Sequence, residues 1–585
     1  MGRITEKEKP EGLNGENSPS SSQEGETVMS SGEKEEKRIS RRDFVRGAAV
    51  GAAGVAAASV LTGCAQEAPA STPEVIKETV EVPVEVIKEV EVKPWLPEKW
   101  DYEADIVVLG LGLAGCAAAI EAHDLGEDVL VLEKAPEALC GGQSRVSGQT
   151  MLCASDAERL MLYQRNLNDP NPVPEDVLQT WAEAIITQRD WISARAEEVG
   201  YEYYPKNMQL IEFPEIEGSD AIEGLGHIKS PEGAAKTWEP FFLNVQNRKI
   251  RVLYETPAIE LVQSAGTKEI LGVVAEKSGE RIHVKANKAV LLCIGGFECN
   301  QQMLKDFYGT RTVYNLGGPF NTGDGIKMLL KAGADLWHMR SMTNTGGYWI
   351  GFKVPEYEPF FRNIMMPASN WIEIARDGKR FYDEAFPWYA KHMHMYVHGE
   401  LQDTPHAECL PAHFIFDETV RKAGQIATIW MSWAIKVQGY EWSKDNSAEI
   451  EKGWIVKADT IRELATKIDR DPDLLEEEIE RYNEFARNGE DLDFGRDPEK
   501  MAPIETPPYY AINIWPCLVA TTGGGRRNKD AQVLDPDGSP IPRLYEAGEL
   551  GSTFGNLYQN GSFLTACIAF GRIAAKNAAA EKPWG

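Results

Sequence analysis

A glycine-rich turn between an apolar run and a helix-forming segment constrains the fold of this chain more than any other feature. Residues 104–110 (ADIVVLG) form a short β-branched run, and the glycines Gly110, Gly112 and Gly115 follow before the helix-forming segment. A second apolar run, DVLVL, ends at Glu133. In such a unit the first glycine permits a tight turn, the second admits a pyrophosphate, and the third allows close packing of helix and strand. With the terminal acid in place, the pattern predicts a dinucleotide site on a parallel sheet.

Length and charge narrow the class of protein further. The chain has 585 residues, which predicts roughly two to four domains. The 61 Lys and Arg residues against 90 Asp and Glu residues leave a formal charge of −29. Such a charge repels a phosphate backbone, so we expect no nucleic-acid partner.

The N-terminal segment, residues 1–64, is typical of a targeting signal. After a polar, acidic lead come Arg41 and Arg42, then an apolar run of small residues, then Leu-Thr-Gly before Cys64. The pattern predicts export by the twin-arginine route and a lipid anchor at Cys64 on the outer face of the cytoplasmic membrane or in the periplasm. A transmembrane helix is the alternative, but the apolar run is shorter than the roughly 20 residues that span a bilayer. Met29 is an alternative start.

A Val/Glu-rich linker, residues 65–100, follows the signal. Valine alternates there with glutamate or lysine, and prolines interrupt the pattern. Period-two alternation is also typical of a strand, but the repeated like charges favour an extended spacer.

Three further motifs lie at junctions of an α/β pattern: GGQSRVSG (141–148), NTGDG (321–325) and LYEAGEL (544–550). With the first unit, they make the chain from about residue 101 onward resemble the fumarate reductase and succinate dehydrogenase flavoprotein superfamily, which includes urocanate reductases and 3-ketosteroid dehydrogenases. The resemblance implies an α/β fold: a GR-type Rossmann-like FAD-binding domain, formed by both chain ends, with an inserted α+β cap domain.

The resemblance also implies domain limits and a cofactor site. We expect residues 101–334 and 507–585 to form the FAD-binding domain and residues 335–506 to form the substrate cap. FAD should be non-covalent, because GGQS lacks the histidine that carries covalent FAD in the membrane-bound succinate dehydrogenases. The residues expected to bind it are Gly110, Gly112, Leu113, Ala114, Gly115, Glu133, Lys134, Gly142, Gln143, Ser144, Gly148, Gly295, Asp324, Glu549, Ser562 and Leu564.

The substrate side departs from the fumarate reductase pattern at three positions. In those enzymes an arginine past a GxRFxNE motif donates the proton, and a histidine and a second arginine hold the substrate carboxylate. The motif here is GKRFYDE, and the three positions fall on Trp388, Ala520 and Tyr558. A dicarboxylate in a water-excluded pocket needs paired cations, so fumarate is disfavoured as the substrate.

A tyrosine occupies the last of these three positions, and another, Tyr389, directly follows Trp388. The 3-ketosteroid dehydrogenase branch has one tyrosine near the donor position and another in the last glycine-rich loop, and Tyr389 and Tyr558 resemble that arrangement. Tyrosine, with a reference pKa near 10, suits proton exchange at a carbon beside a carbonyl. The predicted catalytic residues are Tyr389, Tyr558, Trp388 and Arg380. Aromatic lining is the alternative role for the tyrosines, and Lys391 and His392 are alternative proton donors.

Two other polar clusters, one of histidines and one of arginines, give weaker evidence of a function. His392, His394 and His398 are spaced HxHxxxH, but no carboxylate or cysteine completes a ligand set, and no CxxC or CxxCH motif occurs. We therefore predict no metal site and no haem. Arg526 and Arg527 either bind an anionic substrate at the pocket mouth or lie on the surface.

The sequence thus predicts an exported FAD-dependent reductase of an activated C=C bond, an enone or aromatic enoate rather than fumarate, in which flavin N5 delivers hydride and a tyrosine assists protonation. Because the chain has no haem motif, electrons would come from a separate cytochrome or quinol-linked partner. One alternative is a 3-ketosteroid-dehydrogenase-like enzyme that runs in the oxidative direction. The other is a lipid-anchored flavin relay subunit without substrate chemistry, against which the aromatic-rich cap argues.

Overall fold

The structure is a computed structural model, and it describes residues 96–309, 313–343, 349–355, 361–385, 394–403, 409, 411–427 and 440–584. The predicted signal, its Cys64 and most of the linker lie outside these ranges, as do Trp388, Tyr389, Lys391 and His392. Within the described ranges, no helix combines the length and the apolar character needed to cross a membrane.

Both ends of the described chain contribute strands to one sheet with a parallel centre. Strand β1 (Tyr102–Leu109) lies between β2 (Val129–Leu132) and β9 (Glu280–Leu292), and both pairings are parallel. Near the C-terminus, β24 (Pro540–Glu546) adds parallel to the free side of β9, while β6 (Arg251–Leu253) extends the other edge beside β2. The expected α/β domain formed by both chain ends is therefore confirmed.

The two faces of this sheet are both buried. Along β1, Ile106 and Val108 belong to one apolar core cluster, whereas Val107 and Leu109 belong to another. All four are fully enclosed. A strand covered on both sides needs apolar residues at every position, which explains the unbroken apolar run in the sequence.

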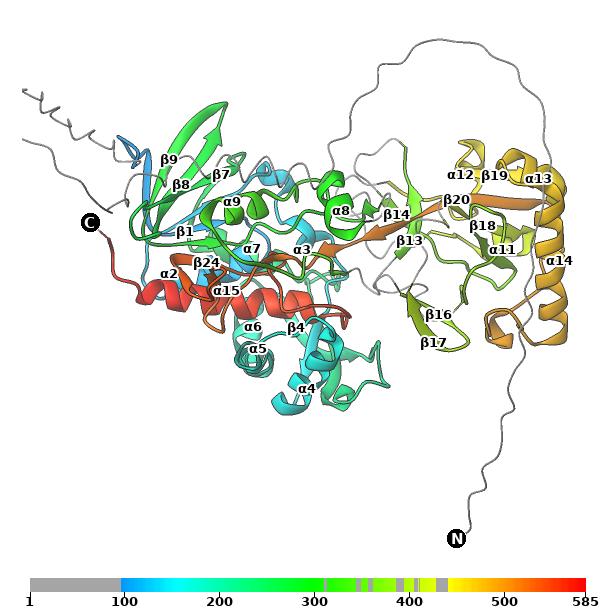
Figure 1. The fold of residues 1–585 in the computed structure, drawn as a ribbon, viewed down its shortest axis with the longest axis horizontal. Helices are drawn as coiled ribbons and strands as arrows, with labels where there is room; N and C mark the ends of the chain where they lie inside the picture. Colours follow the sequence, from blue (N-terminus) through cyan, green and yellow to red (C-terminus); the bar gives the residue numbers. More distant parts are fainter. Residues whose placement is uncertain are drawn as a thin grey trace, which may run out of the picture. The chain divides into compact units, whose positions relative to one another are not determined.

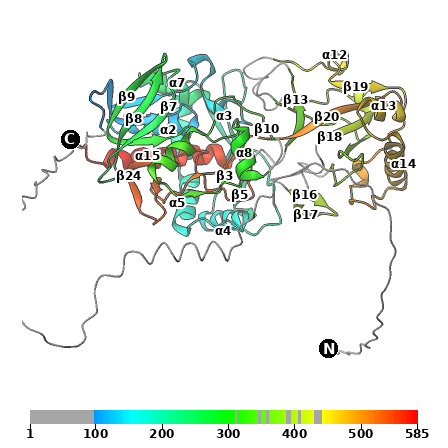
Figure 2. The same cartoon turned by 45° about the horizontal axis from the view of Figure 1, so that its top comes forward.

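Two helices from opposite ends of the chain lie side by side along one face of the sheet (Figures 1 and 2). They are α2 (Leu113–Asp124) and the C-terminal helix α15 (Ser562–Ala580). Their backbones come close at Gly571, where an added Cβ would lie 2.6 Å from an α2 carbonyl oxygen. Farther along, Trp100 and Trp584 pack edge to face with ring centroids 6.2 Å apart. These contacts join the first and last described segments into one domain.

The other elements of this domain surround the central sheet. Strands β7 and β8 form an antiparallel extension from β9, and β3, β5 and β4 form a separate three-stranded sheet. In chain order the elements are η1 (Glu137–Leu139), α3 (Gly142–Val146), β3 (Met151–Ala154), α4 (Ala157–Asn168), α5 (Glu175–Thr187), α6 (Arg189–Glu197), β4 (Glu202–Met208), η2 (Ser219–Ala221), β5 (Ile222–Lys229), α7 (Glu239–Asn247), β7 (Ala258–Gln263), β8 (Ile270–Lys277), α8 (Gln301–Tyr308), α9 (Asp324–Ala332), β11 (Leu336–Trp337), β12 (Met342–Thr343), β21 (Ala520–Thr521), β22 (Gly524–Gly525) and β23 (Gln532–Leu534).

The inserted region is built on a second sheet, in which one long strand is central. Strand β20 (Tyr509–Leu518) pairs with four other strands along its length, and in Figure 1 it is the orange arrow among green and yellow ones. The sheet of the cap thus extends to Leu518, later than the limit expected between residues 506 and 507. The apolar run of β20 suits a buried strand of either sheet, so only its pairing shows which one it joins.

The remaining cap elements flank β20. Its sheet has the order β14-β13-β20-β18-β15, with β10 and β19 also paired to β20. The elements are β10 (Tyr314–Asn315), β13 (Trp349–Lys353), β14 (Phe361–Asn363), β15 (Trp371–Ile374), β16 (His394–Val397), β17 (Glu400–Asp403), β18 (Ala412–Asp417), α11 (Glu418–Ala423), α12 (Ser447–Glu451), β19 (Ile455–Ala458), α13 (Ile461–Lys467), α14 (Pro472–Asn488) and η4 (Pro498–Lys500).

A buried network of two arginines and two carboxylates ties the cap together. Arg380 donates to Glu384 at 2.8 and 2.9 Å and to Asp491 at 2.9 and 3.2 Å. Arg496 also pairs with Glu384, at 3.2 Å. The four side chains are at most 1% exposed. Burial disfavours the charged guanidinium of Arg380, but the two carboxylates outweigh burial and raise its pKa above the ordinary value.

This setting favours a structural role for Arg380 over the catalytic role expected from the sequence. Its guanidinium faces Glu384 and Asp491, and it also stacks over the Tyr482 ring at 5.1 Å. Arg380 is not among the residues that line the large cavity described below.

Replacing Arg380 by glutamine should destabilise the cap without touching the cavity. Glu384 and Asp491 would lose a buried partner, which typically costs about 3–5 kcal/mol, whereas Arg380→Lys keeps the charge and should cost less. Thermal unfolding and limited proteolysis of the two variants would measure the difference. An R380Q protein with wild-type stability, a normal flavin spectrum and no turnover would instead establish a catalytic role.

Candidate active site

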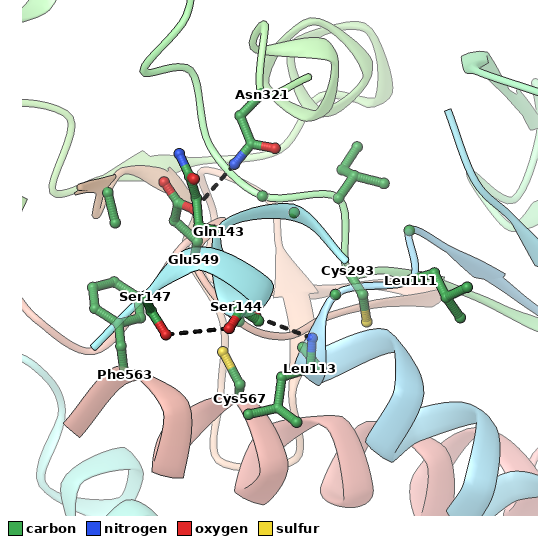
Figure 3. A pocket seen from close by; sticks show the side chains of 18 of the residues that line it. Leu111, Leu113, Gln143, Ser144, Ser147, Cys293, Asn321, Glu549, Phe563 and Cys567 are labelled. Atoms are coloured by element: carbon green, nitrogen blue, oxygen red, sulfur yellow. Dashed lines mark hydrogen bonds between the residues drawn. The ribbon is translucent and has the colours of Figure 1, made fainter. Parts of the chain in front are cut away.

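A large cavity lies where the parallel strands end at their carboxyl edges. It encloses about 1260 Å³ of empty space, part of it open to solvent. Residues directly after β1, β2, β9 and β24 line it, which is where ligands bind in open α/β sheets. Figure 3 shows it above the first turns of α2 and α15. Every residue predicted to bind FAD lines this cavity except Gly115 and Ser562.

The glycine turn has the geometry that the sequence pattern predicts. Gly110 has φ +93°, and an added Cβ would overlap the carbonyl oxygen of Cys293, directly after β9. At Gly115 a Cβ would overlap the Gly110 carbonyl oxygen, so this glycine allows close packing of helix and strand without facing the cavity. The space beside Gly112 is open, with no atom nearer than 3.6 Å to an added Cβ. The α2 N-terminus therefore meets the cavity through backbone.

Glu133 is fixed at the cavity wall by two backbone donors. Its carboxylate accepts from the Leu111 and Ala135 N–H groups, each at 2.7 Å. The residue is 7% exposed. Burial raises the pKa of Glu133, and these two hydrogen bonds oppose the rise. Its contact with a ribose hydroxyl stays a prediction.

Lys134 joins the end of β2 to the start of α9. Its ammonium group donates to Asp324 at 2.8 Å, to the Thr322 hydroxyl at 2.6 Å and to the Phe320 carbonyl at 3.1 Å. On the other side, the Leu113 N–H donates to the Ser144 hydroxyl at 3.1 Å, which connects α2 with α3 (Figure 3). Polar groups from four segments are thus held in place around the cavity.

The residues present fit a bound dinucleotide. Asn560 lines the cavity, and its side-chain carbonyl accepts from the Thr150 hydroxyl at 2.8 Å. Its buried side-chain nitrogen has no hydrogen-bond partner among the described residues. Gly548 has φ +93°, and an added Cβ would lie 3.0 Å from Ala114. An unused amide donor, a backbone cradle and a helix N-terminus are the groups that a polar, anionic cofactor needs.

Of the predicted catalytic residues that the structure describes, Tyr558 lines the cavity and Arg380 does not. It is 5% exposed and packs edge to face on Phe554, with ring centroids 5.3 Å apart. The Phe563 N–H donates to its hydroxyl oxygen at 3.0 Å. Burial raises the pKa of Tyr558 well above its usual range, so the phenol stays protonated. Tyr389 and Trp388 lie outside the described residues.

The position expected for a carboxylate-binding histidine is apolar. Ala520 and its neighbour Val519 line the cavity there. Among the described residues of the cavity wall, Lys134 is the only cation, and it pairs with Asp324.

Arg526 and Arg527 are not among the residues that line this cavity. Arg526 pairs with Asp335 at 2.5 Å, and Arg527 is buried over the Phe570 ring at 3.9 Å. In the described part of the chain, no three His, Cys, Asp or Glu side chains gather as a metal ion would require.

Sequence reasoning missed a buried polar network behind Glu549. Asn321, the first residue of NTGDG, and Glu298, which follows the glycines after β9, take part in it. Neither position was predicted, because the partners of Glu298 come from segments far away along the chain.

Known oxidoreductases are similar to this chain in sequence and in fold. The chain is 27% identical to digoxin reductase of Eggerthella lenta over 94% of this chain and 98% of that protein. It is 28% identical to vinyl phenol reductase of Lactiplantibacillus plantarum over 77% of this chain and 91% of that protein. The fold is similar to the crystal structure of 3-ketosteroid delta1-dehydrogenase from Sterolibacterium denitrificans in complex with 1,4-androstadiene-3,17-dione. That match has a TM-score of 0.67 and 22% identity over 82% of this chain and 99% of that one.

Replacing Gly110 by alanine should abolish tight FAD binding. The new Cβ would overlap the Cys293 carbonyl, and the positive φ of this position is strained for alanine, so we expect a loss of at least about tenfold in affinity. Gly126 offers a matched control, with φ +92° but nothing within 4 Å of an added Cβ. The ratio of bound flavin to protein, measured by absorbance after gel filtration, would be compared between G110A and G126A. Equal flavin content in both variants would contradict the role assigned to the turn.

The family model described as FAD binding domain matches residues 105–563, which include the glycine turn, the cap and the last glycine-rich loop. With the cavity at the strand ends and the fit of its wall to a dinucleotide, this match establishes the cofactor as FAD. The chain belongs to the FAD binding domain family and is an FAD-dependent oxidoreductase.

Proposed function

We propose that this protein reduces an activated C=C bond in a neutral or weakly anionic substrate, an enone or aromatic enoate rather than fumarate. The observation that carries the proposal is the apolar wall at Val519, Ala520 and Phe563, beside the hydroxyl of Tyr558. Bound FAD would supply the two electrons, as hydride from N5 to one substrate carbon.

Charge balance supports this substrate class. A dicarboxylate in a water-excluded pocket loses hydration that only cations or several strong donors replace. In the described cavity wall the ammonium of Lys134 is already paired with Asp324. A planar, largely neutral substrate needs no such compensation and gains from burial against the apolar side chains.

Tyr558 is suited to act as the acid. Because burial favours its neutral form, the phenol retains a proton across the physiological pH range. The hydrogen bond from the Phe563 N–H to its oxygen orients the ring and compensates part of the negative charge that develops when the proton leaves. The hydroxyl can polarise a substrate carbonyl or protonate the carbon next to the one that is reduced. Tyr389 is proposed as its partner.

Relatives of nearly full length support a reductase. Digoxin reductase and vinyl phenol reductase both match most of this chain, and their names describe reduction of organic molecules. The second candidate function is the reverse reaction, in which oxidised FAD dehydrogenates a saturated substrate. The fold similarity to a 3-ketosteroid dehydrogenase supports it, since the same groups serve both directions.

Export, anchoring and electron supply complete the proposal. The twin-arginine pattern at Arg41 and Arg42 and the lipobox at Cys64 support delivery to the outer face of the cytoplasmic membrane. A separate cytochrome or quinol-linked protein would then reduce the flavin, as the chain has no haem motif.

Reoxidation of photoreduced enzyme under anaerobic conditions tests the proposed reaction directly. Some α,β-unsaturated ketone or aromatic enoate should restore the oxidised flavin spectrum rapidly, while fumarate should do so at least about a hundred times more slowly. Rapid turnover of fumarate would contradict the charge argument. Failure of a broad enone and enoate panel would favour the relay function.

Replacing Tyr558 by phenylalanine should slow substrate reduction by about 10²-fold or more while leaving FAD bound. Tyr163→Phe is the matched control, because Tyr163 is also buried and donates to Gln559 of the same loop at 3.1 Å, but it does not line the cavity. Single-turnover reoxidation, with the flavin spectrum as a check on the site, would separate the two variants. Unchanged turnover in Y558F would remove this residue from the proton path.

A further inference from the structure

Two carboxyl groups meet directly behind the FAD cavity. Glu298 follows β9 and Glu549 follows β24, and these strands are parallel neighbours, so their carboxyl ends lie together. Glu298 is completely buried, and Glu549 is 8% exposed and lines the cavity. The two side chains are hydrogen-bonded to each other. Such a bond needs a proton between the two acids.

The donors around the pair show where that proton lies. Glu298 Oε1 accepts from the amides of Gln143 and Asn321, both at 2.6 Å. Glu549 Oε1 accepts from the Thr521 N–H at 2.8 Å and from the Thr521 hydroxyl at 3.2 Å, and its Oε2 accepts from Asn321 at 3.2 Å (Figure 3). Among the described residues, Glu298 Oε2 is the one oxygen of the four that accepts no hydrogen bond from an amide, N–H or hydroxyl donor. A proton on this atom would complete the network.

No described cation compensates the pair. No ion pair reaches either carboxyl within the described residues, and the titratable groups that face them are Tyr308, Cys299 and Cys567. Burial raises the pKa of all three, so they are neutral. Burial also raises the pKa of both glutamates, and repulsion between the two carboxylates opposes their being ionised together. One proton is therefore retained by the pair at neutral pH.

The backbone is shaped to admit this arrangement. An added Cβ on Gly296 would overlap the Thr521 hydroxyl and lie 2.5 Å from Glu549 Oε1 and 2.9 Å from Glu298 Oε2. Gly296 is not among the glycines with positive φ, so space alone requires glycine here. Thr521 and the two glutamates can approach the backbone after β9 this closely because Gly296 has no side chain.

We propose that Glu298 is a positioning residue that keeps one proton on Oε2, donates it in a hydrogen bond to Glu549, and so holds the cavity wall at a single negative charge. Two ionised carboxylates at this place would repel each other and would oppose the arrival of electrons on the flavin. The inference depends on FAD binding, not on the substrate class proposed above.

Glutamine at either position separates the roles of the two acids. In Glu298→Gln, the amide oxygen still accepts from Gln143 and Asn321, and the amide nitrogen replaces the Oε2 proton as donor to Glu549. The charge and the network are preserved. In Glu549→Gln the negative charge is lost, and the new amide nitrogen opposes the Asn321 amide that donates to Oε2.

The flavin midpoint potential, measured without substrate, should therefore be unchanged in E298Q and higher in E549Q. Infrared spectra should lose one protonated carboxyl band in E298Q and keep it in E549Q. Glu373 is a spectroscopic control, because it is a buried acid in the cap whose pKa burial raises to about 8. Glu373→Gln should remove a different band and leave the potential where it is.

Equal shifts of the potential in E298Q and E549Q would overturn the proposal, as would an unchanged carboxyl band in E298Q. If E298Q does not fold, E549Q alone still decides, since a potential that does not move would exclude a negative charge on Glu549. Because none of these measurements uses a substrate, an incorrect substrate class would not affect their outcome.

Discussion

The parallel pairing of β24 with β9 is the contact on which the rest of the structure depends. It brings the last part of the chain beside a strand that already pairs with β1, so three strands from distant segments end at one edge. The cavity lies at that edge, and Gly110, Cys293 and Glu549 reach it directly after these strands. Without this pairing, the two halves of the site would be separated by the whole cap.

Burial at this edge makes charge the controlling property of the site. Glu133 is compensated by two backbone donors, Lys134 by Asp324, and Glu549 by Thr521, Asn321 and the proton assigned to Glu298. Each group is satisfied before any substrate arrives, so the described wall offers no unpaired cation to a dianion. The neutral phenol of Tyr558 fits the same pattern. The proposed preference for a carbonyl compound over a dicarboxylate follows from this wall.

The glycine turn could be predicted because its chemistry is local. Gly110, Gly112 and Gly115 lie within six positions of one another, and the requirements for a tight turn and close approach follow from backbone sterics alone. The sheet that β20 joins and the partners of Arg380 could not be predicted in this way. An apolar run does not reveal which sheet it joins, and the GKRFYDE motif does not reveal that its arginine meets Asp491, more than a hundred positions later.

By itself, the sequence determined the α/β class and the FAD-binding turn, because both depend on residue types at short spacing. That the cations expected to hold fumarate are missing stays a prediction from the sequence. Only the tertiary structure decided that Tyr558 lines the cavity, that Arg380 belongs to the cap network, and that Glu298 and Glu549 face each other. The physical reason is that hydrogen bonds and charge pairs act over a few ångströms of space. Strand pairing, rather than distance along the chain, selects which groups come within that range.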